Sequence, residues 1–233
     1  MGLRTKIAIE AHLEEPRSKT GEKSITMQSM IKRLKLHIGE IVVYSVVILL
    51  LTTGSYWRNK IWNSEIELWV DCVKKSPNKT RPLNNLGGFL SKQGKYQEAI
   101  LHLNKALRID PNYAEAHNNL GNVFLNQSKY QEATNQYNEA LRINPNYAEA
   151  HYNLGNVFLN QSKYQEATLR LNEALRINPN LAEAHSNLGL VFLKQGKYQE
   201  AILHLNEALR INPNLAKTRN NLGIALAHRG KVP

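Results

Sequence analysis

The sequence has a single cysteine and lacks the motifs of the common catalytic and cofactor sites. Cys72 is the only cysteine among 233 residues, so no disulfide within the chain is possible and stability must come from packing. No Gly-rich phosphate loop, no Gly-x-Ser-x-Gly and no His-Glu-x-x-His occurs. We therefore expect a protein that is not an enzyme and that binds no cofactor.

A concentrated stripe of basic residues is also lacking. The formal net charge is +11, from 30 Lys and Arg against 19 Asp and Glu, but the basic residues are spread along the chain. Nucleic-acid binding usually needs Lys and Arg gathered on one face. The sequence therefore predicts a mildly basic, well-solvated surface and no nucleic-acid partner.

Histidines recur, but at a spacing that does not suit a metal ion. His117, His151 and His185 stand 34 residues apart. In stacked helices they would be separated by roughly 10 Å, too far to share one zinc ion. We expect packed or half-exposed imidazoles and no metal site.

One long apolar run is present. Residues 41–57 carry no charge. Extended back to Ile38, the run reaches the roughly 20 residues that a membrane-spanning helix needs. A buried core segment and a cleavable signal peptide are the alternatives. The sequence nearby is not amphipathic enough to cover an apolar helix, and no small-residue cleavage site follows. We predict a single transmembrane helix over residues 38–57, acting as a signal anchor.

The residues that flank this run define its orientation only weakly. Four basic residues lie on each side, so the positive-inside count is a tie. The tight cluster of Lys32, Arg33 and Lys35 favours a cytoplasmic N-terminus and a non-cytoplasmic (periplasmic or lumenal) C-terminal part. Residues 1–37 are predicted to be disordered, because their charge is mixed and their apolar residues show no period.

The rest of the chain repeats with a period of 34 residues and no insertion. Each unit has two helical patterns of apolar residues, joined by a small-residue or polar turn and ended by Asn/Asp-Pro-Asn. Gly recurs at the eighth position and Ala at the twentieth and twenty-seventh. A helical glycine costs up to about 1 kcal/mol relative to alanine, so its recurrence predicts close approach of a neighbouring helix. The units are residues 80–113, 114–147, 148–181, 182–215 and a partial unit at 216–233.

These small residues and the prolines at position 32 match the tetratricopeptide repeat over residues 80–227. The resemblance implies an all-α fold, a right-handed superhelix (an α-solenoid) of paired antiparallel helices with a concave inner face. The fourth position departs from the family pattern, which usually has a large aromatic there. This sequence has Leu83, His117, His151 and His185 instead.

Within the juxtamembrane segment 58–79, residues 61–79 look like half a repeat. Trp69, Cys72 and Pro77 stand where each repeat has its Leu or Tyr, its second Ala and its Pro. We predict a juxtamembrane helix that caps the first repeat, because the ends of a repeat stack need covering.

The sixth position is Asn in every unit, although Asn is not a favourable residue in the middle of a helix. Its amide can grip a peptide backbone. The series is similar to the Asn ladder in the superhelical repeats of O-linked N-acetylglucosamine transferases, where it holds extended peptide. Two interpretations stay open, contact with a partner or bonding to solvent and neighbouring helices. The candidate contact residues on the concave face are Asn85, Asn119, Asn153, Asn187, Asn221, Asn122, Asn156, Asn126, Asn160, Lys92 and Lys194.

A second resemblance covers residues 41–110. Tyr56-Trp57-Arg58-Asn59 leads through Trp62 into Leu68-Trp69-x-Asp71 and Lys75-Ser76-Pro77-Asn78. This stretch resembles the junction between the last membrane helix and the repeat tail of multi-pass proteins related to protein O-mannosyltransferases. We predict a membrane-anchored scaffold that binds a protein or an extended peptide. The alternative is a detached or accessory tail that recruits substrate for such a glycosyltransferase without being catalytic itself.

Overall fold

The computed structural model describes residues 40–56 and 65–229. They belong to two compact units, Met1–Asn59 and Lys60–Pro233. The disorder predicted for residues 1–37 and the first part of the predicted capping segment, residues 58–64, lie outside the described residues.

In the first unit, residues 40–56 form a helix in which every residue is exposed. The hydroxyl groups of Ser45, Thr52 and Thr53 donate hydrogen bonds to carbonyl oxygens four residues earlier in the helix. Across the described ranges, no helix is both long enough and apolar enough to cross a membrane. The span predicted over residues 38–57 includes residues outside the described range at both of its ends, and it stays a prediction.

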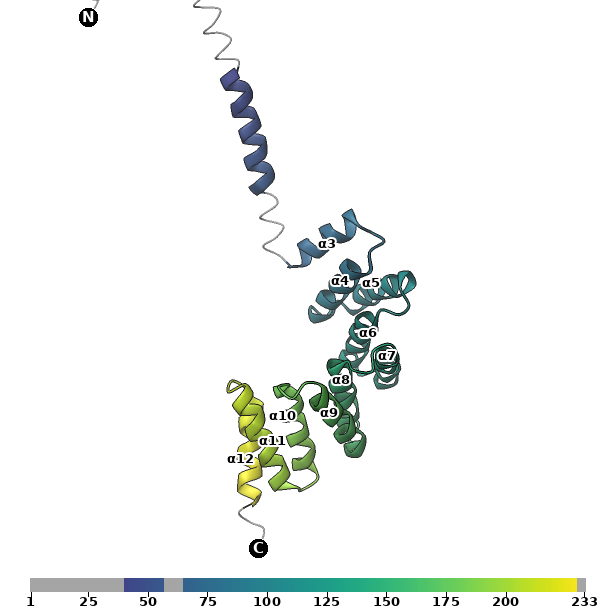
Figure 1. The fold of residues 1–233 in the computed structure, drawn as a ribbon, viewed down its shortest axis with the longest axis vertical. Helices are drawn as coiled ribbons and strands as arrows, with labels where there is room; N and C mark the ends of the chain where they lie inside the picture. Colours follow the sequence, from purple (N-terminus) through teal and green to yellow (C-terminus); the bar gives the residue numbers. More distant parts are fainter. Residues whose placement is uncertain (1–39, 57–64, 230–233) are drawn as a thin grey trace, which may run out of the picture. The chain divides into compact units, whose positions relative to one another are not determined.

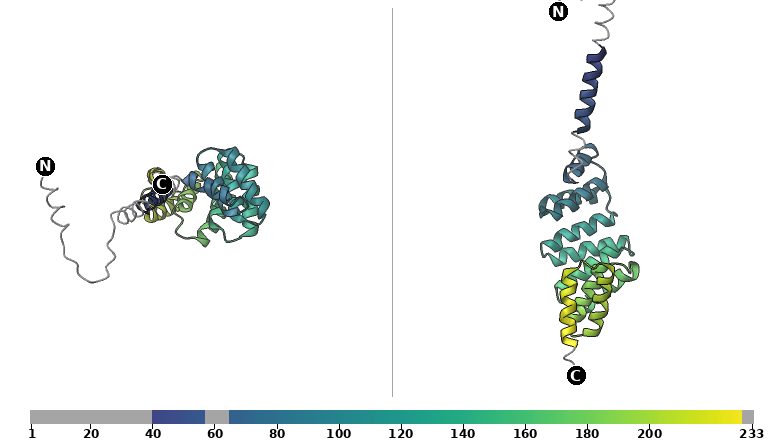
Figure 2. Two further views of the ribbon diagram at one scale, coloured as in Figure 1. Left: turned by 90° about the horizontal axis from the view of Figure 1, so that it is seen from above. Right: turned by 90° about the vertical axis from the view of Figure 1, so that its left-hand side faces the viewer.

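The second unit is built from α-helices, with no strand among residues 65–229. Successive helices stack side by side in the order of the sequence (Figures 1 and 2). Each 34-residue unit forms one pair: α4 with α5, α6 with α7, α8 with α9, and α10 with α11. The helices are α3 (Glu65–Lys75), α4 (Thr80–Lys92), α5 (Tyr96–Ile109), α6 (Ala114–Asn126), α7 (Tyr130–Ile143), α8 (Ala148–Asn160), α9 (Tyr164–Ile177), α10 (Ala182–Lys194), α11 (Tyr198–Ile211) and α12 (Ala216–Arg229).

Glycine sets how closely the two helices of a pair approach. A Cβ atom placed on Gly87 would lie 2.6 Å from Cγ of Leu103, and one on Gly189 would lie 2.6 Å from Cγ of Leu205. Both leucines are fully buried. The second pair uses the same arrangement with a larger side chain, because the buried ring of Tyr137 lies against Gly121. Bare backbone therefore creates the space that the core side chain of the second helix fills.

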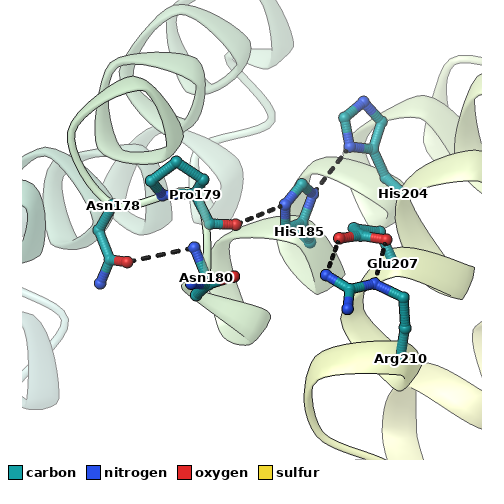
Figure 3. Close-up of polar contacts among 7 residues, drawn as sticks. All are labelled: Asn178, Pro179, Asn180, His185, His204, Glu207 and Arg210. Atoms are coloured by element: carbon teal, nitrogen blue, oxygen red, sulfur yellow. Dashed lines mark hydrogen bonds and ion pairs between the residues drawn. The ribbon is translucent and has the colours of Figure 1, made fainter.

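The histidines at the fourth position link consecutive repeats. Nε2 of each lies within hydrogen-bonding distance of the carbonyl oxygen of the proline six residues earlier: 3.1 Å for His117, 3.0 Å for His151 and 3.2 Å for His185. Figure 3 shows the bond from His185 to Pro179. In α12 the guanidinium of Arg219 makes the same bond to Pro213, at 2.7 Å. A polar group at this position thus satisfies a turn carbonyl, which accounts for the histidines there, whereas Leu83 of the first repeat is buried in the core.

Helices α3 and α12 pack against the two ends of the stack. Ile66, Trp69, Val70 and Val73 of α3 lie against the core that contains Leu83 and Leu86 of the first repeat. At the other end, Ala225 and Leu222 of α12 pack with Leu205 of α11. Each terminal helix therefore covers apolar surface that the adjoining pair would expose.

Candidate partner-binding groove

The first helices of the repeats bring most of the candidate asparagines to one surface. Helices α4, α6 and α8, with Trp69 of α3, enclose a hollow of about 540 Å³, which we call the N-terminal hollow. Lys92 is the one charged side chain among the described residues that line it. The lining residues are Trp69, Asn85, Gly88, Phe89, Ser91, Lys92, Asn119, Asn122, Leu125, Asn126, Tyr152, Asn153 and Asn156.

The remaining candidates lie elsewhere. Asn187 and Asn221 line a second hollow of about 310 Å³ between α10 and α12, which we call the C-terminal hollow. Tyr152 borders both hollows. Asn160 and Lys194 are exposed and are not among the residues that line either one.

Two of the sixth-position asparagines are held by the preceding repeat. Nδ2 of Asn119 donates to Oδ1 of Asn84 at 2.9 Å, and Nδ2 of Asn153 donates to Oδ1 of Asn118 at 3.0 Å. The accepting residues are buried, with exposed fractions of 5% for Asn84 and 3% for Asn118. Sequence reasoning missed this second row, although the Asn-Asn pair in the first two repeats was a visible signal. One N–H of each amide therefore serves the packing of neighbouring first helices.

The pattern changes in the third repeat, where Tyr152 replaces the fifth-position Asn. Asn187 then donates to Oδ1 of Asn156 instead. In the next pair of first helices, the hydroxyl groups of Ser186 and Thr218 lie 2.6 Å apart. Adjacent first helices are thus always joined by a polar contact, although the residues that make it differ from pair to pair. A polar group enclosed between two helices needs a hydrogen bond.

Asn122 is also engaged. The hydroxyl of Tyr137 donates a 2.7 Å hydrogen bond to its Oδ1. Burial raises the pKa of Tyr137 well above its usual range, and nearby Tyr152 adds to the rise, so the hydroxyl stays protonated and remains a donor. The bond fixes the amide of Asn122 at the edge of the N-terminal hollow.

This surface combines oriented amides with aromatic side chains. Trp69, Phe89 and Tyr152 border the N-terminal hollow beside Asn119 and Asn153. Amides can bond a peptide backbone whatever its sequence, and aromatic rings can pack against its side chains. Within the described ranges, no group of three or more His, Cys, Asp or Glu residues is placed to hold a metal ion. The arrangement therefore suits non-covalent binding of a polypeptide.

The chain is similar to several known proteins. It is 34% identical to Protein O-mannosyl-transferase Tmtc3 of Drosophila melanogaster over 67 residues, a match that covers 28% of this chain and only 7% of that protein. Its structure resembles that of PilF of Pseudomonas aeruginosa, with a TM-score of 0.62, 30% identity and coverage of 65% of this chain and 69% of that one. It also resembles YrrB, described as a TPR protein with an unusual peptide-binding site, with a TM-score of 0.56, 25% identity and coverage of 71% and 85%.

Family models match most of the repeat region. A model of the TPR repeat matches residues 90–128, 121–162 and 155–196, and a model of the tetratricopeptide repeat matches residues 182–215. Together the matches run without a gap from residue 90, near the end of α4, to residue 215, and they include the glycine contacts at Gly121 and Gly189 described above. With the likeness to PilF and the all-helical stack, they show that the chain belongs to the tetratricopeptide repeat family.

Proposed function

We propose that this protein is a non-catalytic scaffold that holds an extended segment of a partner protein in the N-terminal hollow. The observation that carries the proposal is that the side-chain amides of Asn119 and Asn153 are only partly hydrogen-bonded. Asn119 and Asn153 each use one N–H for the preceding repeat. Among the described residues, no hydrogen bond engages their Oδ1 atoms or their second N–H groups, so each amide keeps an acceptor and a donor for a peptide backbone.

The internal bonds favour binding as well as packing. An amide that is already fixed by a buried neighbour loses little rotational freedom when it bonds to a ligand. The structural and the binding interpretations of the Asn series are therefore compatible, because the buried row of Asn84 and Asn118 orients the row in front of it. The similarity to YrrB, a TPR protein with an unusual peptide-binding site, supports the same use of the surface.

The test begins with peptides selected on the full chain from a random display library. Replacing Asn85, Asn119 and Asn153, the sixth-position asparagines that line the N-terminal hollow, with Ala should weaken the best peptide at least about tenfold, since each hydrogen bond contributes roughly 0.5–1.5 kcal/mol. Helix content by circular dichroism should stay the same. The matched control replaces Asn138, Asn172 and Asn206, which are exposed on the second helices, and should leave the affinity unchanged. Equal affinities for the two triple variants would contradict the proposal.

We propose in addition that residues 38–57 anchor the protein in a membrane, with the repeats on the non-cytoplasmic side. Support comes from the helix at residues 40–56, where large apolar side chains stand exposed, Ile41 at 62% and Leu50 at 66%. Such a surface is unfavourable in water and favourable in lipid. Extraction with alkaline carbonate should leave the protein in the membrane pellet. Protease added to sealed vesicles reports the side, and digestion of the repeats from the cytoplasmic face would contradict the orientation.

A second candidate function is favoured by one observation, the similarity to Tmtc3. On that basis the chain acts as an accessory repeat tail that recruits substrate to a multi-pass glycosyltransferase. Crosslinking in intact membranes, followed by identification of the captured protein, separates the two candidates. Capture of a multi-pass transferase supports the accessory role, whereas capture of unrelated proteins through the N-terminal hollow supports the independent scaffold.

A further inference from the structure

Two turns inside the repeats hold a serine where glycine fits more easily. The turn between α6 and α7 has Ser128 at φ 58°, and the turn between α8 and α9 has Ser162 at φ 57°. The corresponding turns of the first and fourth repeats have Gly94 at φ 75° and Gly196 at φ 74°. In this left-handed region the Cβ of an ordinary residue crowds the following carbonyl group, so serine is a costly choice there.

Each strained serine comes with a second change two residues earlier. The first and fourth repeats read Lys-Gln-Gly at these three positions, starting at Lys92 and Lys194. The second and third repeats read Asn-Gln-Ser, starting at Asn126 and Asn160. Asn-x-Ser, where x is not Pro, is the acceptor sequence for N-linked glycans. The two changes together therefore create an acceptor sequence that neither change creates alone.

The acceptor asparagines are accessible. Asn126 is the last residue of α6 and Asn160 is the last residue of α8, and both are exposed, as are Ser128 and Ser162. Neither asparagine contributes to the buried core. A glycan at either position would extend into solvent from a helix end, with no loss of packing. A third acceptor sequence starts at Asn78, which is exposed in the turn between α3 and α4.

We propose that Asn126 and Asn160 are N-glycosylation sites, with Asn78 as a further acceptor. The proposal rests on the orientation proposed above, because glycan transfer takes place on the non-cytoplasmic side. The donor is an oligosaccharide linked to a lipid through a diphosphate, and the catalyst is a membrane oligosaccharyltransferase. Nδ2 of the asparagine forms a bond to the anomeric carbon of the sugar. The bond from that carbon to the diphosphate oxygen breaks, the lipid diphosphate leaves, and Nδ2 loses one proton.

The two sites differ in their relation to the binding surface. Asn126 lines the N-terminal hollow next to Leu125 and Asn122, whereas Asn160 lines neither hollow. A glycan on Asn126 therefore narrows access to the N-terminal hollow. A glycan on Asn160 leaves that access unchanged, and the pair provides its own internal control.

The test translates the full chain in a cell-free system with endoplasmic-reticulum microsomes, after an Asn-Ser-Thr acceptor tag has been added behind Pro233. We expect gel bands of reduced mobility that collapse after treatment with an endoglycosidase. Asn126→Gln and Asn160→Gln should each remove one glycan. Ser128→Gly should also remove one, while it keeps Asn126 and restores the backbone of the Gly94 turn. Loss of the glycan in that variant shows that the acceptor sequence, and not the asparagine alone, is recognised.

The tag separates failure of this inference from failure of the proposed orientation. If the tag is glycosylated while Asn126→Gln and Asn160→Gln leave the band pattern unchanged, the inference is wrong and the orientation stands. If neither the tag nor the native sites receive a glycan, both are wrong. Peptide affinity tests whether the glycan on Asn126 restricts the N-terminal hollow. Removal of the glycan from Asn126 should increase the affinity of the selected peptide, and removal from Asn160 should not.

Discussion

Replacing Gly189 with Ala tests the packing on which the whole stack depends. The new Cβ atom would lie 2.6 Å from Cγ of Leu205, 2.8 Å from its Cδ2 and 3.2 Å from the carbonyl oxygen of Ala201. Carbon atoms in contact are normally about 3.5–4.0 Å apart, so Leu205 would have to move by about 1 Å. Leu205 is fully buried and Ala201 presents backbone, so neither can yield easily.

A matched control isolates this contact. Gly223 occupies the same place in α12, where a Cβ atom would meet nothing within 4 Å. Both substitutions gain up to about 1 kcal/mol of helix propensity. Only Gly189→Ala also has the cost of overpacking, about 1–3 kcal/mol. We therefore expect Gly223→Ala to stabilise its helix, and Gly189→Ala to be less favourable than the control by about 1–3 kcal/mol.

Hydrogen exchange followed by mass spectrometry, measured on the full chain, is the suitable assay. A repeat array opens locally, so peptides from α10 and α12 report the two sites separately. Gly155→Ala should have a cost between those of the other two variants, since its Cβ would lie 2.9 Å from Cγ of Leu171 and 3.5 Å from the carbonyl oxygen of Ala167. If Gly189→Ala protects α10 as well as Gly223→Ala protects α12, the reasoning about close packing is refuted.

Three further predictions follow from other contacts. Trp69→Ala should destabilise the first repeat by roughly 1–3 kcal/mol, less than a fully buried aromatic would, and unchanged exchange in α4 would mean that α3 does not support it. Ser162→Gly should stabilise its turn by roughly 1 kcal/mol, since it removes left-handed strain; a lower denaturation midpoint would contradict this. The third concerns pH. Burial, and secondarily His185, lowers the pKa of His204 in the folded chain. As the pH falls, this imidazole is therefore protonated in the unfolded chain before it is protonated in the folded chain. The stability contribution is complete above about pH 6.5 and declines as the pH falls below it. Denaturation midpoints at pH 7.5 and pH 5 should therefore differ less in His204→Gln than in the unmodified chain, and an equal difference would count against the assignment.

The pH prediction has a structural basis that only the folded chain provides. Nδ1 of His185 and Nδ1 of His204 lie 3.1 Å apart. Figure 3 shows the two rings facing each other through these atoms. One proton fits between them, so two imidazolium ions there would repel each other. In the second repeat the equivalent partner of His117 is Gln136, at 2.8 Å. His204→Gln therefore copies an arrangement that the protein already uses.

The helix pairs could be predicted from the sequence because their determinants are local and periodic. The period of 34 residues follows from recurring glycines and prolines, and each proline prevents the preceding residue from continuing a helix. The close approach at Gly87 and Gly189 was predicted for the same reason, since a helical glycine has a cost that a packing contact explains. The polar role of His117, His151 and His185 was not predicted. The sequence does not show that the proline carbonyl six residues earlier lies beside the histidine, because only the folded turn brings the two together.

The candidate site was likewise predicted only in part from the sequence. Composition and position alone selected the sixth-position asparagines as polar groups on the first helices. Their hydrogen bonds join residues 35 positions apart, Asn119 to Asn84 and Asn153 to Asn118, and these partners depend on how neighbouring repeats are rotated. Tyr152 separates two hollows in what the sequence presents as one continuous series.

The sequence by itself determined the family, the helix pairing and the glycine contacts, because a repeated local pattern has one consistent way to bury its apolar face. Only the tertiary structure decided which amide groups of the Asn series are bonded internally and which have no bond among the described residues. That distinction depends on distances between side chains of different repeats, and the angle at which one helix pair lies against the next fixes those distances.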